Sequence, residues 1–147
     1  MKEIVKHSKK SEGQEIWLHT NGSGKTEKWW RELYSMLDPE RDRVVFGVDG
    51  LKDTAHMYRK FAKFDDSITA MKIGAEYGMR LNEWQFIVFK FNKHQVQQAR
   101  QMAKDIGIRF YIIKSERWDI NDDDELDDPL MPSKEWLPKE FVKRHNL

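Results

Sequence analysis

Apolar residues follow two spacings in turn along the chain, one typical of strands and the other of helices. Short apolar runs predict four β-strands, over about 15–20, 43–48, 84–91 and 108–113. Between them, apolar residues recur every three or four positions, as they do on the buried face of a helix. This pattern predicts helices over about 26–37, 67–77 and 96–106, and a further helix that carries Met57, Tyr58, Phe61 and Phe64.

Turn-forming and capping residues mark where these elements begin and end. Asn21-Gly22 and Asp49-Gly50 follow the first two strands, and Asn92 follows the third. Asp53 is the predicted N-cap of the helix after the second strand, and Asn92 that of the last helix. Asp38-Pro39, Gly78 and Gly107 are predicted helix ends.

The order of the elements, β-α-β-α-β-α-β, favours parallel strands joined by helical crossovers. We therefore expect an α/β fold, either a partial (β/α) barrel or a curved parallel sheet of about four strands with flanking helices. Residues 1–14 form an N-terminal segment and 15–118 the α/β domain. Residues 119–147 contain the acidic run Asp122–Asp128, expected to be a loop, and the amphipathic segment Trp136–Val142, expected to dock on the domain.

The amino-acid composition narrows the range of functions that the chain can have. The 147 residues include 26 basic and 25 acidic side chains, and this balance gives no reason to expect a nucleic-acid or membrane partner. With no apolar span and no apolar signal segment near Met1, a cytoplasmic location is expected. The chain has no cysteine, which excludes disulfides, thiol catalysis, thiolate zinc sites and thiolate-bound iron–sulfur clusters within it. The aromatic residues Trp29, Trp30, Phe86 and Phe89 are expected in the core.

A glycine-rich segment, Gly22-Ser23-Gly24-Lys25-Thr26, lies between a predicted strand and a helix. It is similar to the end of a phosphate-binding P-loop, but His19 stands where that pattern needs its first glycine. A phosphate-binding hydrolase that uses Lys25 and Asp49 is therefore one open alternative. His19, Asp49 and His94 have the side chains of a metal-ligand set, but no helical or loop spacing fixes them together, so a metal site is not expected.

The strand ends, taken together, form an ordered series: His19-Thr20-Asn21-Gly22, Val48-Asp49-Gly50-Leu51, Tyr58-Arg59 and Phe91-Asn92. This series resembles the middle and later strands of the radical S-adenosylmethionine (radical SAM) barrel, especially in peptide-modifying enzymes. The resemblance covers roughly residues 15–114. Gly47 departs from it, since the family has a serine there, and the three-cysteine cluster motif is absent together with the glycine-rich strand that follows it.

The resemblance implies a set of S-adenosylmethionine contacts. Thr20, Asn21 and the adjoining Gly22 would lie near the ligand, and Asp49-Gly50 would form the turn beneath its ribose. Arg59 would pair with its carboxylate, and Asn92 would bind ribose or adenine. A 4Fe–4S cluster would be present only if another chain supplied it. The same residues have ordinary structural interpretations: turn formers, a helix cap at Asn92 and a surface cation at Arg59.

Three functions stay open at this stage. The leading one is a truncated or split radical SAM-related protein that retains part of the ligand pocket. The second is a non-catalytic binding or assembly module, and the third is the phosphate-binding hydrolase. Under the first, the strand at 15–20 is an exposed edge that needs cover. Residues 1–12, a second copy of the chain, or a complementary radical SAM half could provide it.

Overall fold

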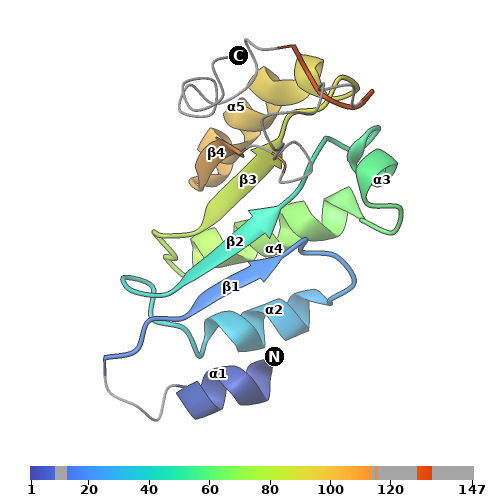
Figure 1. Cartoon of the computed structure of the whole chain (residues 1–147). Coiled ribbons are helices and arrows are strands. Elements are labelled where there is room, and N and C mark those ends of the chain that lie inside the picture. The colour runs from blue at the N-terminus through green and yellow to red at the C-terminus, as the bar shows by residue number, and fades with distance from the viewer. Residues whose placement is uncertain (9–12, 114, 116–128, 134–147) are drawn as a thin grey trace, which may run out of the picture.

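A computed structural model describes residues 1–8, 13–113, 115 and 129–133. Its centre is one parallel sheet in which the strands lie in chain order, β1-β2-β3-β4, without closing into a barrel (Figure 1). The α/β class and the parallel sheet of four strands are thereby confirmed. The strands are β1 (Trp17–Thr20), β2 (Arg43–Gly47), β3 (Glu83–Ile87) and β4 (Arg109–Ile113).

The helices that join the strands lie where the sequence predicts them, but several differ from the prediction in length. Their bounds are α1 (Lys2–Ser8), α2 (Glu27–Tyr34), α3 (Ala55–Tyr58), α4 (Phe64–Glu76) and α5 (Val96–Ile106), preceded by a 3-10 turn, η1 (Lys93–Gln95). The Thr26 side chain caps α2 by accepting a hydrogen bond from Trp29 N. Gly107 ends α5 in the left-handed conformation, with φ +83°.

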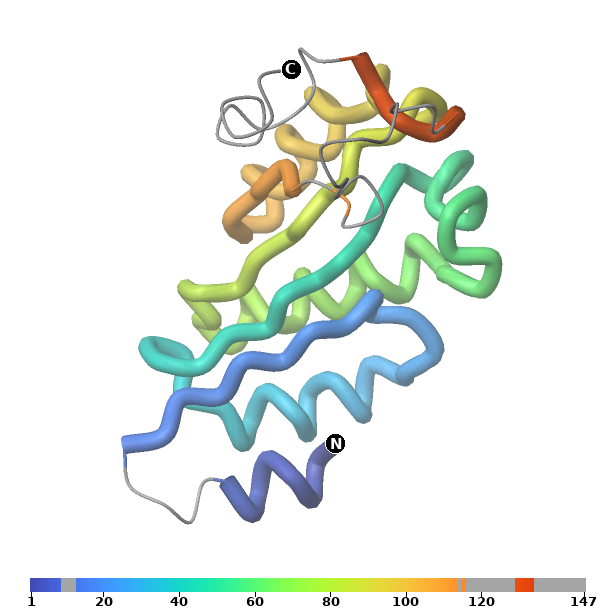
Figure 2. Tube along the Cα trace, viewed as in Figure 1, coloured from blue at the N-terminus to red at the C-terminus, as the bar shows by residue number. Residues whose placement is uncertain are grey.

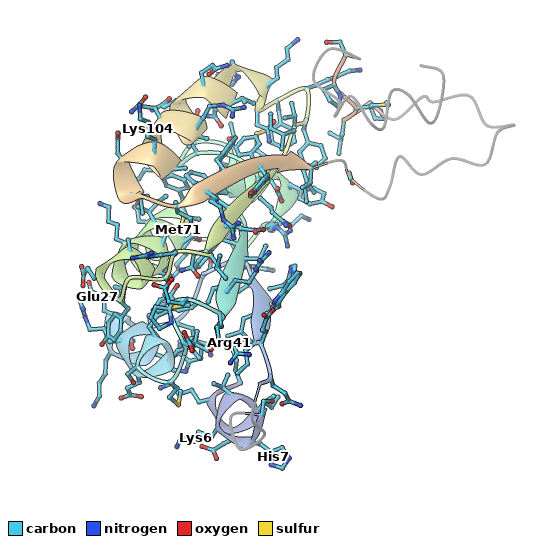
Figure 3. All side chains as sticks on the ribbon, turned by 90° about the vertical axis from the view of Figure 1, so that its left-hand side faces the viewer. Lys6, His7, Glu27, Arg41, Met71 and Lys104 are labelled. Atoms are coloured by element: carbon cyan, nitrogen blue, oxygen red, sulfur yellow. The ribbon has the colours of Figure 1, made fainter. Side chains whose placement is uncertain are left out.

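The helices that connect the strands, α2, α4 and α5, all lie on the same face of the sheet (Figures 1 and 3). Because side chains alternate between the faces of a strand, each strand sends one set toward these helices and the other set away from them. In Figure 3, Met71 points into the layer between α4 and the sheet, whereas Lys104 points outward from α5. We call the face without these helices the open face.

The core lies between the sheet and the helices. Its largest fully buried side chains include Trp30 of α2, Phe46 of β2, and Trp84 and Phe86 of β3. Trp84 is fully buried, and its indole Nε1 donates to Val48 O at 2.9 Å. The predicted core role of the aromatic residues is confirmed for Trp30 and Phe86, which belong to this cluster, and for Phe89, which is buried in a second, smaller one.

The segment after β2 differs from the prediction. The helix that was expected to carry Met57, Tyr58, Phe61 and Phe64 is only the four-residue α3, and Phe64 begins α4 instead. Phe61 is 93% exposed. Thr54, and not Asp53, precedes α3. Asp53 Oδ1 instead accepts a hydrogen bond from Gln95 Nε2 at 2.6 Å, so its carboxylate is used in a contact across the fold.

The third strand is shorter than predicted, because the chain turns after Ile87. Asn92 stands at the cap position of η1, but its side chain makes no capping hydrogen bond, contrary to the prediction. Its amide reaches back to the end of β3 instead. The acidic run 122–128 and the segment 136–142 lie outside the described residues.

The N-terminal residues form a helix that the sequence did not predict. Val5 of α1 is buried in the main core, and Lys2 contacts Glu32 of α2. Figure 2 shows α1 beside α2, at the β1 end of the molecule. The helix therefore extends the helical layer past the edge strand. Within residues 1–8, 13–113, 115 and 129–133, β1 and β4 each pair with a single neighbouring strand.

Candidate active-site pocket

One pocket of about 320 Å³ lies on the open face, at the carboxyl ends of the strands. In parallel α/β sheets, this is the end where ligands bind, because the loops that follow the strands converge there. The pocket is built by the ends of β1, β2 and β3 and by Arg59, which follows α3. The residues that line it are His19, Thr20, Asn21, Val45, Gly47, Asp49, Arg59, Gln85, Ile87 and Ile113.

The polar centre of the pocket is the ion pair between Asp49 and Arg59. Arg59 Nε donates to Asp49 Oδ2 at 3.1 Å. The carboxylate is almost completely buried, whereas the guanidinium side chain is 41% exposed. Asp49 Oδ1 accepts a second hydrogen bond from Ile87 N at 2.9 Å, which ties the end of β2 to the end of β3. Asp49 therefore fixes the strand ends and orients Arg59 at the same time.

Burial dominates the electrostatics of Asp49. Removal from water disfavours the charged carboxylate and raises the pKa of Asp49 above its ordinary value. The hydrogen bond from Ile87 N and the positive charge of Arg59 oppose that shift without cancelling it. Ionisation of the buried Asp49 therefore costs free energy, and the positive charge of Arg59 reduces that cost.

Gly47 makes room for the Arg59 side chain. A Cβ at Gly47 would lie 3.2 Å from Arg59 Nη2 and 3.9 Å from Thr20 O. The guanidinium thus lies over the position where a side chain of β2 would otherwise stand. Arg59 therefore occupies the space that a side chain at this position would need.

Thr20 and Asn21 form the β1 side of the pocket and also shape the loop after it. Thr20 Oγ1 accepts from Gly22 N, and Asn21 Oδ1 accepts from Ser23 N, both at 3.0 Å. A hydroxyl that accepts one hydrogen bond keeps its own proton as a donor, and a carboxamide keeps its NH₂ group. Both side chains therefore retain donors for a ligand.

The glycine-rich loop is folded on itself and on α4. The backbone N–H groups of Gly22, Ser23 and Gly24 donate to Thr20, Asn21 and Asp66 side chains, respectively. Lys25 Nζ lies 5.3 Å from the centre of the Trp29 ring. Donors that a phosphate cradle needs are already used, and Lys25 does not line the pocket.

Three of the residues singled out from the sequence support the pocket from outside it. Gly22 adopts φ +77°, and a Cβ there would lie 2.9 Å from Ser67 Cα. Gly50 adopts φ +138°, and a Cβ there would lie 2.4 Å from Thr54 Oγ1. Asn92 is fully buried: it accepts from Phe89 N at 2.7 Å and donates to Ile87 O at 2.9 Å and Asp49 O at 3.3 Å. Its amide joins the two strand ends.

Sequence reasoning missed His19 and Gln85 as pocket residues. Both lie on strands and point to the open face, two positions before Asn21 and Ile87. Because side chains alternate between the two faces of a strand, both residues could have been predicted if the open face had been known to carry the pocket. Among the described residues, no group of His, Cys, Asp and Glu side chains is arranged to hold a metal ion.

Comparison with known proteins adds no family to this geometry: no protein-family model matches the chain, and no curated protein matches it significantly. Within the described residues, every helix is too short or too polar to cross a bilayer.

Proposed function

We propose that this chain is a radical SAM-related polypeptide that retains part of an S-adenosylmethionine pocket and receives any 4Fe–4S cluster from another chain. The observation that carries the proposal is the convergence of Thr20, Asn21, Asp49 and Arg59 on one pocket. These residues come from three separate segments of the chain. A cytoplasmic location is part of the proposal.

The pocket suits a polar ligand of moderate size. A volume of about 320 Å³ falls within the range that small-molecule sites have, roughly 300–1,000 Å³. The exposed part of the Arg59 guanidinium would bind the carboxylate of the ligand, because its donors match a carboxylate in pairs. Thr20 and Asn21 would supply donors from the opposite side. Asp49 would not contact the ligand's carboxylate but would hold Arg59 in place.

The residues do not fit the cluster itself. A 4Fe–4S cluster in this class needs three thiolates, and the chain has no cysteine. When bound, S-adenosylmethionine supplies an activated sulfonium group. The residues of this chain bind and orient the ligand, and no electron transfer is assigned to them. The role of the chain is therefore that of the ligand-binding half of a divided site.

Calorimetric titration of the isolated chain with S-adenosylmethionine tests this proposal. We expect saturable binding to the wild-type chain and a loss of about tenfold or more in affinity with Arg59→Ala, since charge-assisted hydrogen bonds contribute about 1.5–3 kcal/mol. Arg59→Lys keeps the charge but not the paired donors, so its affinity should lie between the two.

Two controls make the result specific. Arg80→Ala removes an exposed arginine that pairs with Glu40 on the surface, and it should leave the affinity unchanged. Methylthioadenosine has no carboxylate, so Arg59→Ala should weaken its binding much less than that of S-adenosylmethionine. Absence of binding to the folded wild-type chain, or equal loss for both ligands, contradicts the proposal.

The alternatives differ in their support. The glycine-rich loop gives no support to the phosphate-binding hydrolase, because its backbone N–H groups already have acceptors. The binding or assembly module is favoured by a specific observation, the open face of the sheet.

A further inference from the structure

The amino-terminal end of the open face carries a cluster of charged side chains, on the same face as the pocket but at the other end of the strands. Glu83 of β3 lies between Arg43 of β2 and Arg109 of β4. Glu83 Oε1 is 2.9 Å from Arg43 Nη1 and 3.0 Å from Arg109 Nη2. We call these three residues the arginine cluster. It contains two guanidinium groups and one carboxylate.

The cluster leaves hydrogen-bond donors without acceptors. The Nε atoms of Arg43 and Arg109 are both buried and make no hydrogen bond within the part of the chain that the structure describes. A buried donor without a partner costs about 1–3 kcal/mol, so native proteins seldom leave one unpaired. Arg109 Nη2 also donates to Leu81 O, and Arg43 lies 4.0 Å above the ring of Trp17. The two guanidiniums are therefore held in place on a face that offers them only one carboxylate.

Among the described residues, the connecting helices lie on the opposite face of the sheet, and β1 and β4 are its two edge strands. Trp17 on β1 is 55% exposed and Tyr111 on β4 is 44% exposed, and both project from the open face. Large aromatic side chains with a polar group are typical of protein–protein interfaces. The open face thus has the features of an interface, with an unbalanced positive charge.

We propose that the open face docks a strand-bearing protein partner that presents a carboxylate side chain to Arg43 and Arg109. The charge of the cluster selects this partner over a second wild-type copy. In each chain the cluster has a net charge of +1, because two arginines face one glutamate. Two copies joined through this face would bring two positive clusters together, and like charges brought together at an interface cost several kcal/mol.

The inference goes beyond ligand binding. It rests on the proposed function only in naming the partner as the chain that supplies the 4Fe–4S cluster. Docking itself does not need S-adenosylmethionine. Calorimetry tests the ligand and association tests the partner, so either proposal can fail alone.

A charge-swapped copy of the same chain is a defined probe for the missing partner. With Arg43→Glu, the cluster has two carboxylates and one guanidinium, a net charge of −1. A wild-type chain and this variant have complementary clusters, and a two-fold rotation would place the β4 edge of each beside the β1 edge of the other. Sedimentation velocity on the wild-type chain, the variant, and their equal mixture measures the association.

We expect each protein alone to sediment as a monomer and the mixture to form a dimer, with an affinity about tenfold or more above self-association of either. High salt should weaken this dimer. In the mixture, the Arg109 Nε–H resonance of the ¹⁵N-labelled wild-type chain should shift, because the partly exposed guanidinium gains a second carboxylate neighbour. Arg80→Glu makes the same charge change away from the open face, and its mixture with wild type should stay monomeric.

Folding of the variant is checked by circular dichroism and thermal melting. Arg109→Glu makes the same change from β4 if Arg43→Glu does not fold. Self-association of the wild-type chain through β1 and β4 would overturn the inference, because the face would then accept a second copy. A mixture that stays monomeric with a folded variant would also overturn it.

Discussion

The two faces of the sheet differ in chemistry although the same four strands form both. Toward the helices, β2 and β3 present Val44, Phe46, Trp84 and Phe86, all of them fully buried. Toward the open face, the same strands present Arg43, Gly47, Glu83 and Gln85, with a pocket at one end and the arginine cluster at the other. One face is a hydrophobic core. The other is mainly polar, but it also carries the buried Val45 and Ile87, and Ile87 packs with Ile113, Leu130 and Met131 in the second, smaller core cluster.

This difference shows how stability and function are divided in the molecule. Burial of apolar area on the helix-covered face stabilises the fold, since it removes large aromatic side chains from water. The open face contributes fixed charges and donors that are only partly used within the chain. We therefore expect substitutions on the two faces to differ in kind: those on the first affect folding, and those on the second affect binding and pH dependence.

The sharpest contrast in stability is expected between Trp84 and Tyr111, which lie on neighbouring strands but on opposite faces. Trp84→Ala should lower the free energy of unfolding by about 3–5 kcal/mol, because it leaves a large cavity in the core and removes the donor to Val48 O. Tyr111→Ala should lower it by less than about 1 kcal/mol, because this ring is 44% exposed. Urea denaturation of both variants measures the difference.

Similar losses for the two variants would contradict the division between the faces. The tyrosine would then contribute to folding as much as the tryptophan, and the open face would have to be treated as a second core.

The sequence was sufficient for the helix-covered face and for four of the residues that line the pocket, Thr20, Asn21, Asp49 and Arg59. Apolar periodicity located all four strands, and the order of elements predicted their parallel pairing, because helical crossovers allow little else. The convergence of Asp49 and Arg59 could also be expected from strand ends that meet at one edge. The resemblance to radical SAM barrels selected these residues, but the ion pair itself could not be predicted from spacing.

The sequence did not show what depends on long-range contacts. Asn92 follows a strand and precedes a helix, so local rules favour a cap; its amide is used instead by backbone groups that the turn after β3 leaves unpaired. Residues 1–8 contain too few apolar side chains to predict a helix, and α1 is placed by the burial of Val5 against the core. The arginine cluster could not be predicted either, because its three residues come together only through the register of β2, β3 and β4.

The next effect in size is expected at Asn92, which joins the pocket to the core. Asn92→Ala removes three hydrogen bonds to the backbone at the ends of β2 and β3, and should lower the free energy of unfolding by about 2–3 kcal/mol. Asn92→Asp should be at least as damaging, because a carboxylate oxygen would face two carbonyl oxygens. Denaturation measures both. A change below about 0.5 kcal/mol would show that water satisfies these groups equally well.

A smaller change in stability than at Asn92 is expected at Arg59, and its size depends on pH. Burial raises the pKa of Asp49 in the folded state, so its contribution to stability is greatest below the ordinary carboxyl pKa and decreases as pH rises through the folded value. Arg59 limits this decrease. Arg59→Ala should raise the pKa of Asp49 further and cost about 1–2 kcal/mol at neutral pH, less than a fully buried pair because Arg59 is 41% exposed.

Below about pH 3.9, where the carboxyl group is protonated in both states, the cost of Arg59→Ala should become small. Denaturation of wild type and variant across the acid-to-neutral range measures this dependence. The matched control is the same substitution in an Asp49→Asn background, where the neutral amide still accepts from Ile87 N but does not titrate, so the pH dependence should disappear. A cost that is equal at all pH values would mean that Arg59 stabilises the fold through packing alone. The guanidinium would then not be the counter-charge that makes a buried carboxylate tolerable on the open face.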